Sequence, residues 1–292
     1  MKTGPLVAAP RRVGVVVKPG SAEAVELGKR LLGELARRGV AGVSDDESAK
    51  VLGVAPIATR ATLGEHADVL IVLGGDGTFL SVTRDCPART PVAGINLGTL
   101  GFLTEHAPEA AFDLLDTVLA GRAAIERRDR LKVRVENGPA RAFQVLNDVV
   151  ITKAALARIV TIWIEVEGEF LTRYRADGLI LATPTGSTAY NLSAGGPIVH
   201  PALGALLITP ICSHTLSNRP LAVPLDFTVR VGVEPGEAEL YLTLDGQVGL
   251  PMHPEMSVVV GPGAEPLSVI REPDASFFSI LHRKLKWGDR EA

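Results

Sequence analysis

The stretch 69–78, VLIVLGGDGT, constrains the fold of this chain more than any other. Five consecutive branched apolar residues bounded by turn formers are typical of a strand buried on both faces, as in a parallel sheet. Three glycines then allow a sharp reversal, a positive φ and a close approach of a ligand to the backbone. Thr78 opens an apolar-periodic segment, and a helix N-terminus beside consecutive amides favours phosphate. The stretch therefore predicts an α/β fold with a phosphate-binding loop.

A carboxylate, Asp76, stands in the middle of this loop. A negative charge inside a phosphate-binding loop is unfavourable unless it binds a cation or handles a proton. Asp76 is therefore the first candidate for a catalytic group.

The N-terminal part of the chain alternates strand and helix patterns. Apolar periodicity and the glycines Gly39 and Gly121 predict strands at 11–17, 40–43, 69–73 and 92–96 and helices at 22–38 and 108–120. Such alternation implies a doubly wound, mostly parallel sheet. We expect this α/β domain to cover residues 1–121.

After Gly121 the pattern changes to short alternating strands with turn signals, including the hairpin dipeptide Asp245-Gly246. We predict a β-rich, antiparallel, sandwich-like domain over 122–274. The segment 276–287 is helical in pattern, and we expect the tail 275–292 to pack back on the first domain.

Charge and cysteine content exclude several classes of protein. The net charge is −3 and no run of basic residues exceeds two, so no nucleic-acid or membrane-surface partner is expected. Two distant cysteines, Cys86 and Cys212, fit a reducing cytoplasm. The N-terminus has no apolar signal-peptide region, and the apolar segment 202–212 contains Pro210 and is too short for a membrane span. We expect a cytoplasmic protein.

Common catalytic signatures are missing. The chain has no GxxxxGK[ST], HExxH, paired CxxC or GxSxG, and Leu80 occupies the third glycine position of a dinucleotide fingerprint that would begin at Gly75. The six histidines are scattered, and we assign none of them. No metal-ligand set is predicted.

A second polar cluster, Asn147-Asp148, lies between the apolar segments 143–145 and 149–151. An amide and a carboxylate side by side suit hydrogen bonds to ribose hydroxyls or to a base edge. An Asx turn between two strands is the alternative.

The third cluster follows the apolar strand 177–182, which begins at Asp177. Residues 183–196, TPTGSTAYNLSAGG, offer hydroxyls and amides for a phosphate or ribose, and Tyr190 offers a ring for stacking on a base. A loop so long and polar is usually functional. A solvated Ω-loop is the alternative.

Taken together, these stretches resemble the NAD kinase family. The matching segments, in the family's order, are GGDGT (74–78), NLGTLGFLTE (96–105), NDVVI (147–151), DGLILATPTGSTAYNLSAGGPIVHP (177–201), HTLSNRPL (214–221) and LDGQ (244–247). GGDGT alone is shared with lipid kinases of the diacylglycerol kinase type and with phosphofructokinases, whereas TPTGSTAYNLSAGGP is specific. A lipid or sugar kinase and a non-catalytic NAD(P)-binding sensor are the competing interpretations.

The resemblance implies transfer of a phosphoryl group from ATP to the 2′-hydroxyl of the adenosine ribose of NAD, with Asp76 as proton acceptor. The nucleotide-binding residues it implies are Gly74, Gly75, Gly77, Thr78, Asn147, Asp148, Arg158, Arg175, Asp177, Thr188, Ala189, Tyr190, Asn191, Ser193, Asp245 and Gln247. Two positions depart from the family pattern. Asp148 stands where Glu is commoner, and Ser81 stands where many members have a basic residue for phosphate contact.

The resemblance also implies a divalent metal, expected to be Mg²⁺, that arrives with ATP. It implies a homodimer or homotetramer built through the β-rich domain. Whether ATP or inorganic polyphosphate is the donor stays open, as does the choice between NAD and NADH.

Overall fold

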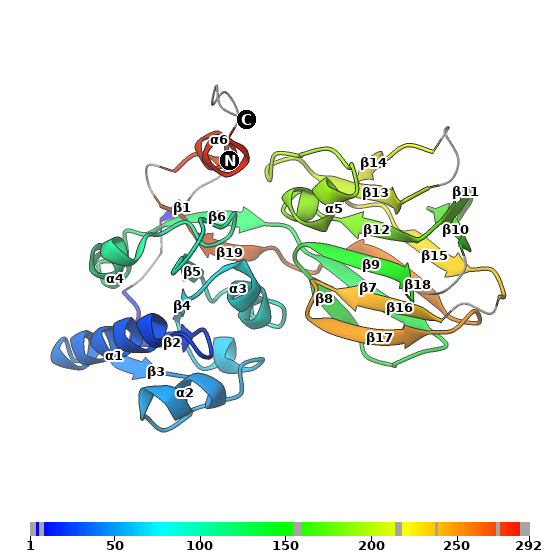
Figure 1. Cartoon of the computed structure of the whole chain (residues 1–292). Helices are drawn as coiled ribbons and strands as arrows, with labels where there is room; N and C mark the ends of the chain where they lie inside the picture. Colours follow the sequence, from blue (N-terminus) through cyan, green and yellow to red (C-terminus); the bar gives the residue numbers. More distant parts are fainter. Residues whose placement is uncertain are drawn as a thin grey trace. The chain divides into compact units, whose positions relative to one another are not determined.

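The structure is a computed structural model that describes residues 4–5, 9–154, 159–213, 218–236, 239–272 and 275–286. The chain forms two compact units, Met1–Arg127 with Leu267–Ala292, and Arg128–Pro266. The chain thus leaves the first unit after Arg127 and returns to it at Leu267, so the first unit is built from two separate segments. Figure 1 shows both units, and each is described here by itself.

The first unit contains one seven-stranded sheet. Its order across the sheet is β1 (Gly4–Pro5), β6 (Ala124–Arg128), β19 (Leu267–Ile270), β5 (Val92–Ile95), β4 (Val69–Leu73), β2 (Arg12–Val17) and β3 (Ala41–Val43). The pairs from β19 to β3 are parallel, and β1 pairs antiparallel with β6. All five residues of β4 are buried, as a central parallel strand requires. The predicted α/β class is confirmed.

Helices pack on this sheet (Figure 1). They are α1 (Ala22–Arg37), α2 (Asp46–Leu52), α3 (Asp76–Thr83) and α4 (Ala111–Leu119), with short 3₁₀ turns η1 (Leu63–Glu65) and η2 (Pro108–Ala110). The same unit also contains α6 (Phe277–Leu285). α1 shows why these segments are helical. The Ser21 side chain accepts the Ala24 N–H at the N-cap, and the helix buries Leu27, Leu31 and Leu35 along one side.

The predicted C-terminal helix is present as α6 and belongs to the first compact unit. Ser276 and Ser279 form a reciprocal capping box at its start. Ile280 and Leu281 of this helix are buried.

The second unit is a sandwich of two six-stranded antiparallel sheets. One has the order β11 (Glu169–Ala176), β10 (Val160–Val166), β15 (Val229–Val233), β18 (Ser257–Pro262), β7 (Leu131–Glu136), β8 (Phe143–Val145). The other has β14 (Leu221–Pro224), β13 (Ala205–Ile211), β12 (Gly178–Ala182), β9 (Asp148–Lys153), β16 (Leu240–Leu244), β17 (Val248–Met252). Apolar residues of both sheets form one core.

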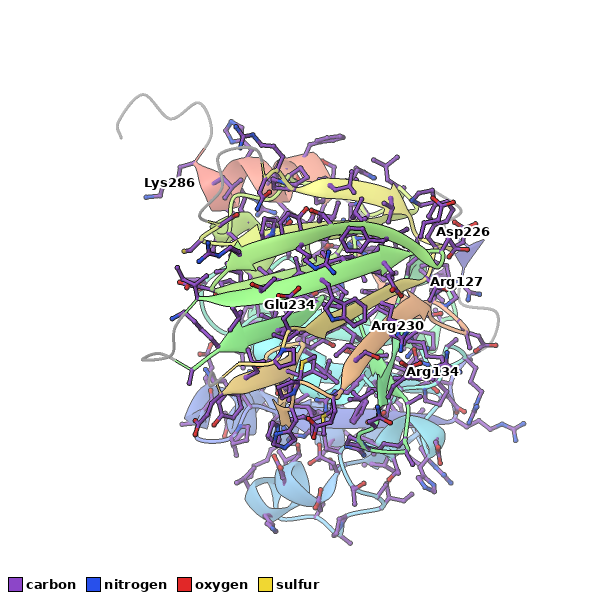
Figure 2. The ribbon with its side chains drawn as sticks, turned by 90° about the vertical axis from the view of Figure 1, so that its right-hand side faces the viewer. Arg127, Arg134, Asp226, Arg230, Glu234 and Lys286 are labelled. Carbon is purple, nitrogen blue, oxygen red and sulfur yellow. The ribbon has the colours of Figure 1, made fainter. Side chains whose placement is uncertain are left out.

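The first of these two sheets has a charged outer face. Arg134 of β7 and Arg230 of β15 lie in one cross-strand row with Val259 between them, and both arginines are exposed (Figure 2). Arg230 also pairs with Glu136 at 2.6 Å. This outer face contrasts with the apolar inner face, which is the alternation expected of a sandwich sheet. The predicted antiparallel, β-rich class is confirmed.

Two strands lie outside the domain in which the expected domain boundaries, 122 and 274, place them. β6 and β19 belong to the sheet of the first unit, and the boundaries between the units along the chain fall after Arg127 and after Pro266. The pairing partner of a short strand is decided by contacts distant in sequence, and local periodicity carries no information about it.

None of the helices in the described part of the chain combines the length and the apolar character that a membrane span needs.

Candidate functional site

The parallel strands β2, β4 and β5 end together. The register aligns Val17 with Leu73 and Leu73 with Ile95, so the residues that follow emerge at one edge of the sheet. These residues are Lys18, Gly74 and Asn96. Ligands of open α/β sheets bind outside the carboxyl ends of the strands, so this edge is the candidate site of the first unit.

The glycines of the loop serve packing and access, and none of them has a positive φ. A Cβ on Gly74 would lie 2.6 Å from Thr78 Oγ1 and 2.9 Å from Thr78 Cβ. By contrast, a Cβ on Gly75 or Gly77 would have no heavy atom within 4 Å. The positive φ that glycine allows is therefore not used in this loop. Gly74 is needed for close packing, while Gly75 and Gly77 leave open space beside the backbone.

α3 begins at Asp76, with Gly75 as its N-cap, so the helix opens two residues before the predicted Thr78. The Asp76 carboxylate is held by four donors from a neighbouring loop. Its Oδ2 accepts the Phe102 N–H at 2.9 Å. Its Oδ1 accepts the Leu103 N–H at 3.1 Å, the Thr104 N–H at 3.1 Å and the Thr104 hydroxyl at 3.0 Å. A carboxylate offers about four acceptor positions, two on each oxygen, so Oδ1 is saturated and Oδ2 retains one.

The loop that supplies these donors is supported by two residues that are not among the predicted site residues. A Cβ on Gly101 would lie 2.0 Å from Asp76 Oδ1, so only glycine allows this approach. The buried Asn96 donates from Nδ2 to the Thr99 carbonyl at 2.9 Å and to Thr104 Oγ1 at 2.8 Å. The glycine-punctuated NLGTLGFLT segment was the available sequence signal.

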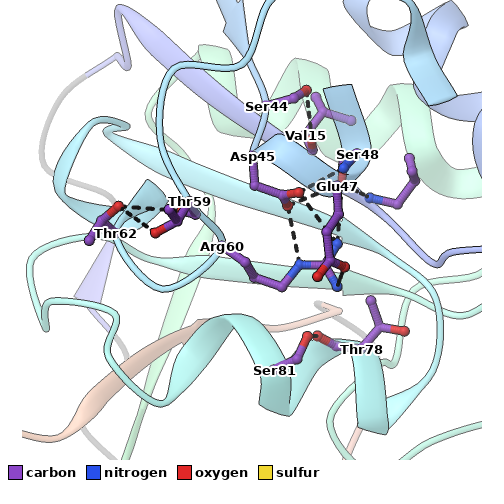
Figure 3. A network of polar contacts seen from close by, with 11 residues as sticks. Val15, Ser44, Asp45, Glu47, Ser48, Thr59, Arg60, Thr62, Thr78 and Ser81 are labelled. Atoms are coloured by element: carbon purple, nitrogen blue, oxygen red, sulfur yellow. Dashed lines mark hydrogen bonds and ion pairs between the residues drawn. The ribbon is translucent and has the colours of Figure 1, made fainter. Parts of the chain in front are cut away.

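The Ser81 hydroxyl is directed at its own helix and does not replace the phosphate contact of a basic residue. It donates to the Thr78 carbonyl at 2.7 Å (Figure 3). Lys18 is a cation at this edge that the sequence analysis did not identify. It is exposed, and its Cβ lies 3.1 Å from the position of a Cβ on Gly74.

A buried polar network fixes the chain just before Lys18. The Ser48 hydroxyl accepts the Val17 N–H at 3.0 Å, and Asp45 accepts the Ser48 N–H at 2.7 Å (Figure 3). Arg60 pairs with Asp45 at 3.3 Å and balances its buried charge. The carboxyl end of β2 is therefore rigidly held.

In the second unit, Asp245 organises the Asn147-Asp148 pair. Its Oδ2 accepts the Leu146 N–H at 2.9 Å, and its Oδ1 accepts the amides of Asn147 at 2.7 Å and Asp148 at 3.1 Å. Asp245 and Gly246 have φ of 49° and 62°, which form the predicted hairpin turn between β16 and β17. The Asp245 side chain is buried and directed at the backbone, so it positions the pair.

Asp148 is itself buried, and burial raises the pKa of its carboxyl to about 7. The nearby charge of Asp245 raises this pKa further, and the hydrogen bond from the Tyr190 N–H partly opposes both effects. The neighbouring Asn147 is buried as well, and its Oδ1 has no hydrogen-bond partner in the described structure. Buried polar atoms are rarely left unpaired, so this acceptor is available for a ligand.

The loop 183–196 is not the solvated Ω-loop that was the alternative interpretation of its composition. Four of its polar side chains, on Thr183, Thr185, Ser187 and Asn191, are buried. The Asn191 amide donates to the Ser187 carbonyl at 3.2 Å and the Pro197 carbonyl at 3.1 Å, and Asn191 Oδ1 accepts the Thr209 hydroxyl at 2.6 Å. These polar side chains therefore pack inside the loop and support it.

The other predicted residues of this unit are more accessible. Tyr190 is 44% exposed, Ser193 is exposed, and Thr188 and Ala189 are partly exposed. Arg175 is exposed on β11 and Gln247 is exposed after the hairpin turn. Asp177 pairs with Lys153 at 3.6 Å. Arg158 lies outside the described residues.

Comparison with known families gives two adjacent matches. The ATP-NAD kinase N-terminal domain matches residues 13–123, and the ATP-NAD kinase C-terminal domain matches residues 146–272. The chain is 45% identical over 281 residues to the NAD kinase of Syntrophobacter fumaroxidans, covering 95% of this chain and 99% of that protein. It is 41% identical over 283 residues to the NAD kinase of Solibacter usitatus, covering 96% and 99%.

Two solved structures share this fold. A yeast NADH kinase complexed with NADH is 26% identical, with a TM-score of 0.85, covering 98% of this chain and 89% of that one. An NAD kinase from Archaeoglobus fulgidus in complex with ATP is 26% identical, with a TM-score of 0.75, covering 94% and 98%.

Proposed function

This chain belongs to the ATP-NAD kinase family, and we propose that Asp76 is the group that accepts the proton in its reaction. The reaction is the ATP-dependent phosphorylation of NAD at the 2′-hydroxyl of its adenosine ribose, which yields NADP. NAD and ATP are its substrates, and neither the lipid or sugar kinase nor the non-catalytic sensor is favoured.

The unfilled acceptor position on Asp76 Oδ2 is the observation that supports this role. Three donors fix Oδ1, and one donor leaves Oδ2 with room for a single further hydrogen bond. A ribose hydroxyl that donates to Oδ2 is then held in one orientation. As the γ-phosphoryl group of ATP bonds to the hydroxyl oxygen, its bond to the oxygen that bridges it to ADP breaks, ADP leaves, and the hydroxyl proton passes to Oδ2. A positioned acceptor of this kind contributes roughly 10²–10⁴-fold to the rate.

Phosphate binding is assigned to the open side of the loop 74–78. Gly75 and Gly77 have free space where a side chain would be, and Thr78 lies in the first turn of α3. Helix N-termini favour anions, and phosphoryl transfer depends mainly on positioning and on charge neutralisation. The exposed Lys18 supplies a positive charge at the same edge and replaces the basic group that Ser81 lacks.

NAD binding is assigned to Asn147 and Asp148 together with the accessible face of the loop 188–193. The unpartnered Asn147 Oδ1 accepts a hydrogen bond from the ligand, and the exposed Tyr190 ring offers a stacking surface. We propose that Asn191 and Asp245 support this surface from behind. Arg175, Asp177, Gln247 and Arg158 remain candidates for peripheral nucleotide contacts.

Mg²⁺ is expected to enter with the triphosphate. In the described part of the chain, no three His, Cys, Asp or Glu side chains come together as a metal-ligand set. The donor set at the loop is one carboxylate, Asp76, whose Oδ1 is already saturated. These residues fit a metal whose ligands are phosphate oxygens and water, and Mg²⁺ prefers such a shell. When bound, the ion offsets phosphate charge.

The substrate assignment is tested by product analysis. Purified enzyme is incubated with Mg²⁺ and NAD, and NADP is measured with a coupled dehydrogenase. ATP and inorganic polyphosphate are compared as donors, and NADH, diacylglycerol and fructose 6-phosphate are compared as acceptors. NADP formation from NAD with ATP is expected. Phosphorylation of the lipid or the sugar without formation of NADP would refute the assignment.

We also infer a homo-oligomer and a cytoplasmic location. The edge strand β11 exposes Phe170 (56%) and Leu171 (38%), and apolar residues on an edge strand favour pairing with another copy. Cys86 and Cys212 are both reduced cysteines, which suits a reducing compartment. Sedimentation velocity would distinguish a monomer from the expected dimer or tetramer.

A further inference from the structure

The segment 101–104, which carries all four donors to Asp76, is contacted by a residue of the C-terminal helix. Lys284 donates from Nζ to the Leu100 carbonyl. The same Nζ lies 5.5 Å from the centroid of the Phe102 ring, within the range of a cation–π interaction. One ammonium group therefore binds the residue before Gly101 and the residue after it.

Phe102 has a specific place in the site. Its N–H is the donor to Asp76 Oδ2, the oxygen that retains an acceptor position. The other three donors all bind Oδ1. A movement of the Phe102 amide therefore changes the orientation of the oxygen assigned to the ribose hydroxyl.

The helix that carries Lys284 is anchored by buried side chains and by an N-terminal cap. Ile280 and Leu281 are buried, and Lys284 follows them by four and three residues, which places all three side chains on one side of the helix. The capping box at Ser276 fixes the first turn. Lys284 is thus held in a capped helix, whereas the segment 101–104 contains a glycine and forms no helix or strand.

We propose that Lys284 is a positioning residue for the reaction. It holds the Leu100–Phe102 backbone so that the Phe102 N–H keeps Oδ2 of Asp76 oriented toward the hydroxyl. The inference rests on the proposed role of Asp76. It assigns a role in turnover to the C-terminal helix.

The test compares Lys284→Met, Lys284→Arg and Arg283→Met. Methionine keeps the apolar stem but removes the charge and the donor. Arginine retains the charge, the donors and the ability to stack on Phe102. Arg283 is an exposed neighbour on the same helix, and its replacement changes the net charge by the same amount.

We expect Lys284→Met to lower kcat about tenfold with KM for NAD within twofold of wild type, because misplaced catalytic groups cost rate more than binding. Lys284→Arg should return kcat to within about twofold of wild type, since charge and donors are restored. Arg283→Met should match wild type. An unchanged kcat in Lys284→Met, a loss that arginine does not restore, or an equal loss in Arg283→Met would each overturn the proposal.

Asp76→Asn separates this proposal from the one on which it rests. If Asp76→Asn retains turnover, the proposed role of Asp76 fails. If it abolishes turnover while Lys284→Met has no effect, only the role of Lys284 fails. In the Asp76→Asn background, Lys284→Met should cause no further loss. A further tenfold loss there would show that Lys284 acts on a different group.

Discussion

At the scale of single residues, the site depends on how hydrogen bonds are divided between the two oxygens of Asp76. The sequence identifies Asp76 because a carboxylate in a phosphate loop needs an explanation. It does not reveal the donors, since three of the four are backbone amides 26 to 28 positions away. Backbone amides occur at every residue except proline, so the residue type does not indicate which of them donate to Asp76. Gly101 is the residue whose identity indicates that the 101–104 segment approaches the Asp76 carboxylate closely.

Gly101→Ala is expected to abolish most activity. The new Cβ would lie 2.0 Å from Asp76 Oδ1 and 2.4 Å from Thr104 Oγ1, so the carboxylate or the segment must move. We expect kcat to fall about 100-fold, since a misplacement of about 1 Å has this effect. Gly98→Ala is the matched control, because its Cβ would meet its nearest neighbour only at 3.9 Å. Equal kcat values for the two variants would contradict this account of Gly101.

Asp148 should make the stability of the protein decrease as pH rises. Its pKa is about 7 in the folded protein against 3.8 for an ordinary Asp, so the folded state holds a proton that the unfolded state releases between these values. Where the folded state binds more protons, stability falls with rising pH. The loss in the free energy of unfolding caused by Asp148 is absent below pH 4 and complete above pH 7. It amounts to roughly 4 kcal/mol at most.

The measurement is the melting temperature of wild type and Asp148→Asn without ligand from pH 4 to pH 8. The two should agree near pH 4, and the asparagine variant should become progressively more stable above pH 5. A difference that stays constant with pH would show that Asp148 does not titrate in this range.

At the scale of elements, the loop 183–196 shows what composition cannot reveal. Its polar residues indicate a functional loop, but they do not indicate that the structure uses several of them as an internal framework. Asn191 bonds two carbonyls and Thr209, and the Ser187 hydroxyl lies 2.6 Å from the Pro184 carbonyl, to which it donates, and 3.1 Å from the Val199 carbonyl. Polar side chains can be buried when each finds partners, and composition cannot show whether partners exist. By contrast, the hairpin at Asp245-Gly246 is local chemistry and was predicted.

Asn191→Ala is expected to destabilise the second unit. It leaves the Ser187 carbonyl and the Thr209 hydroxyl buried without their partner and removes the bond to the Pro197 carbonyl, and we expect a loss of about 3 kcal/mol in the free energy of unfolding. Ser193→Ala, at an exposed position of the same loop, should change stability by less than about 0.5 kcal/mol. Chemical denaturation measures both. A stable Asn191→Ala protein with a raised KM for NAD would instead make Asn191 a ligand contact.

At the scale of the whole molecule, the two classes of unit were predictable and their exact membership was not. Buried runs such as β4 and alternating strands such as β7 differ in local pattern, and this difference identifies a parallel sheet and a sandwich. β6 and β19 are short, and each joins the first sheet through partners far away in the chain. The first unit therefore contains residues from both ends of the sequence, and the C-terminal helix belongs to the same unit as Asp76.

The central claim is that Asp76 accepts the proton of the ribose hydroxyl, and single-turnover kinetics test it most directly. Enzyme saturated with NAD is mixed rapidly with ATP and Mg²⁺, and the rate of NADP formation is compared between wild type and Asp76→Asn. Calorimetric titration with NAD and the melting temperature check that binding and fold persist. The account predicts a rate at least about 100-fold lower with NAD affinity within a few-fold of wild type. A rate within a few-fold of wild type would contradict it.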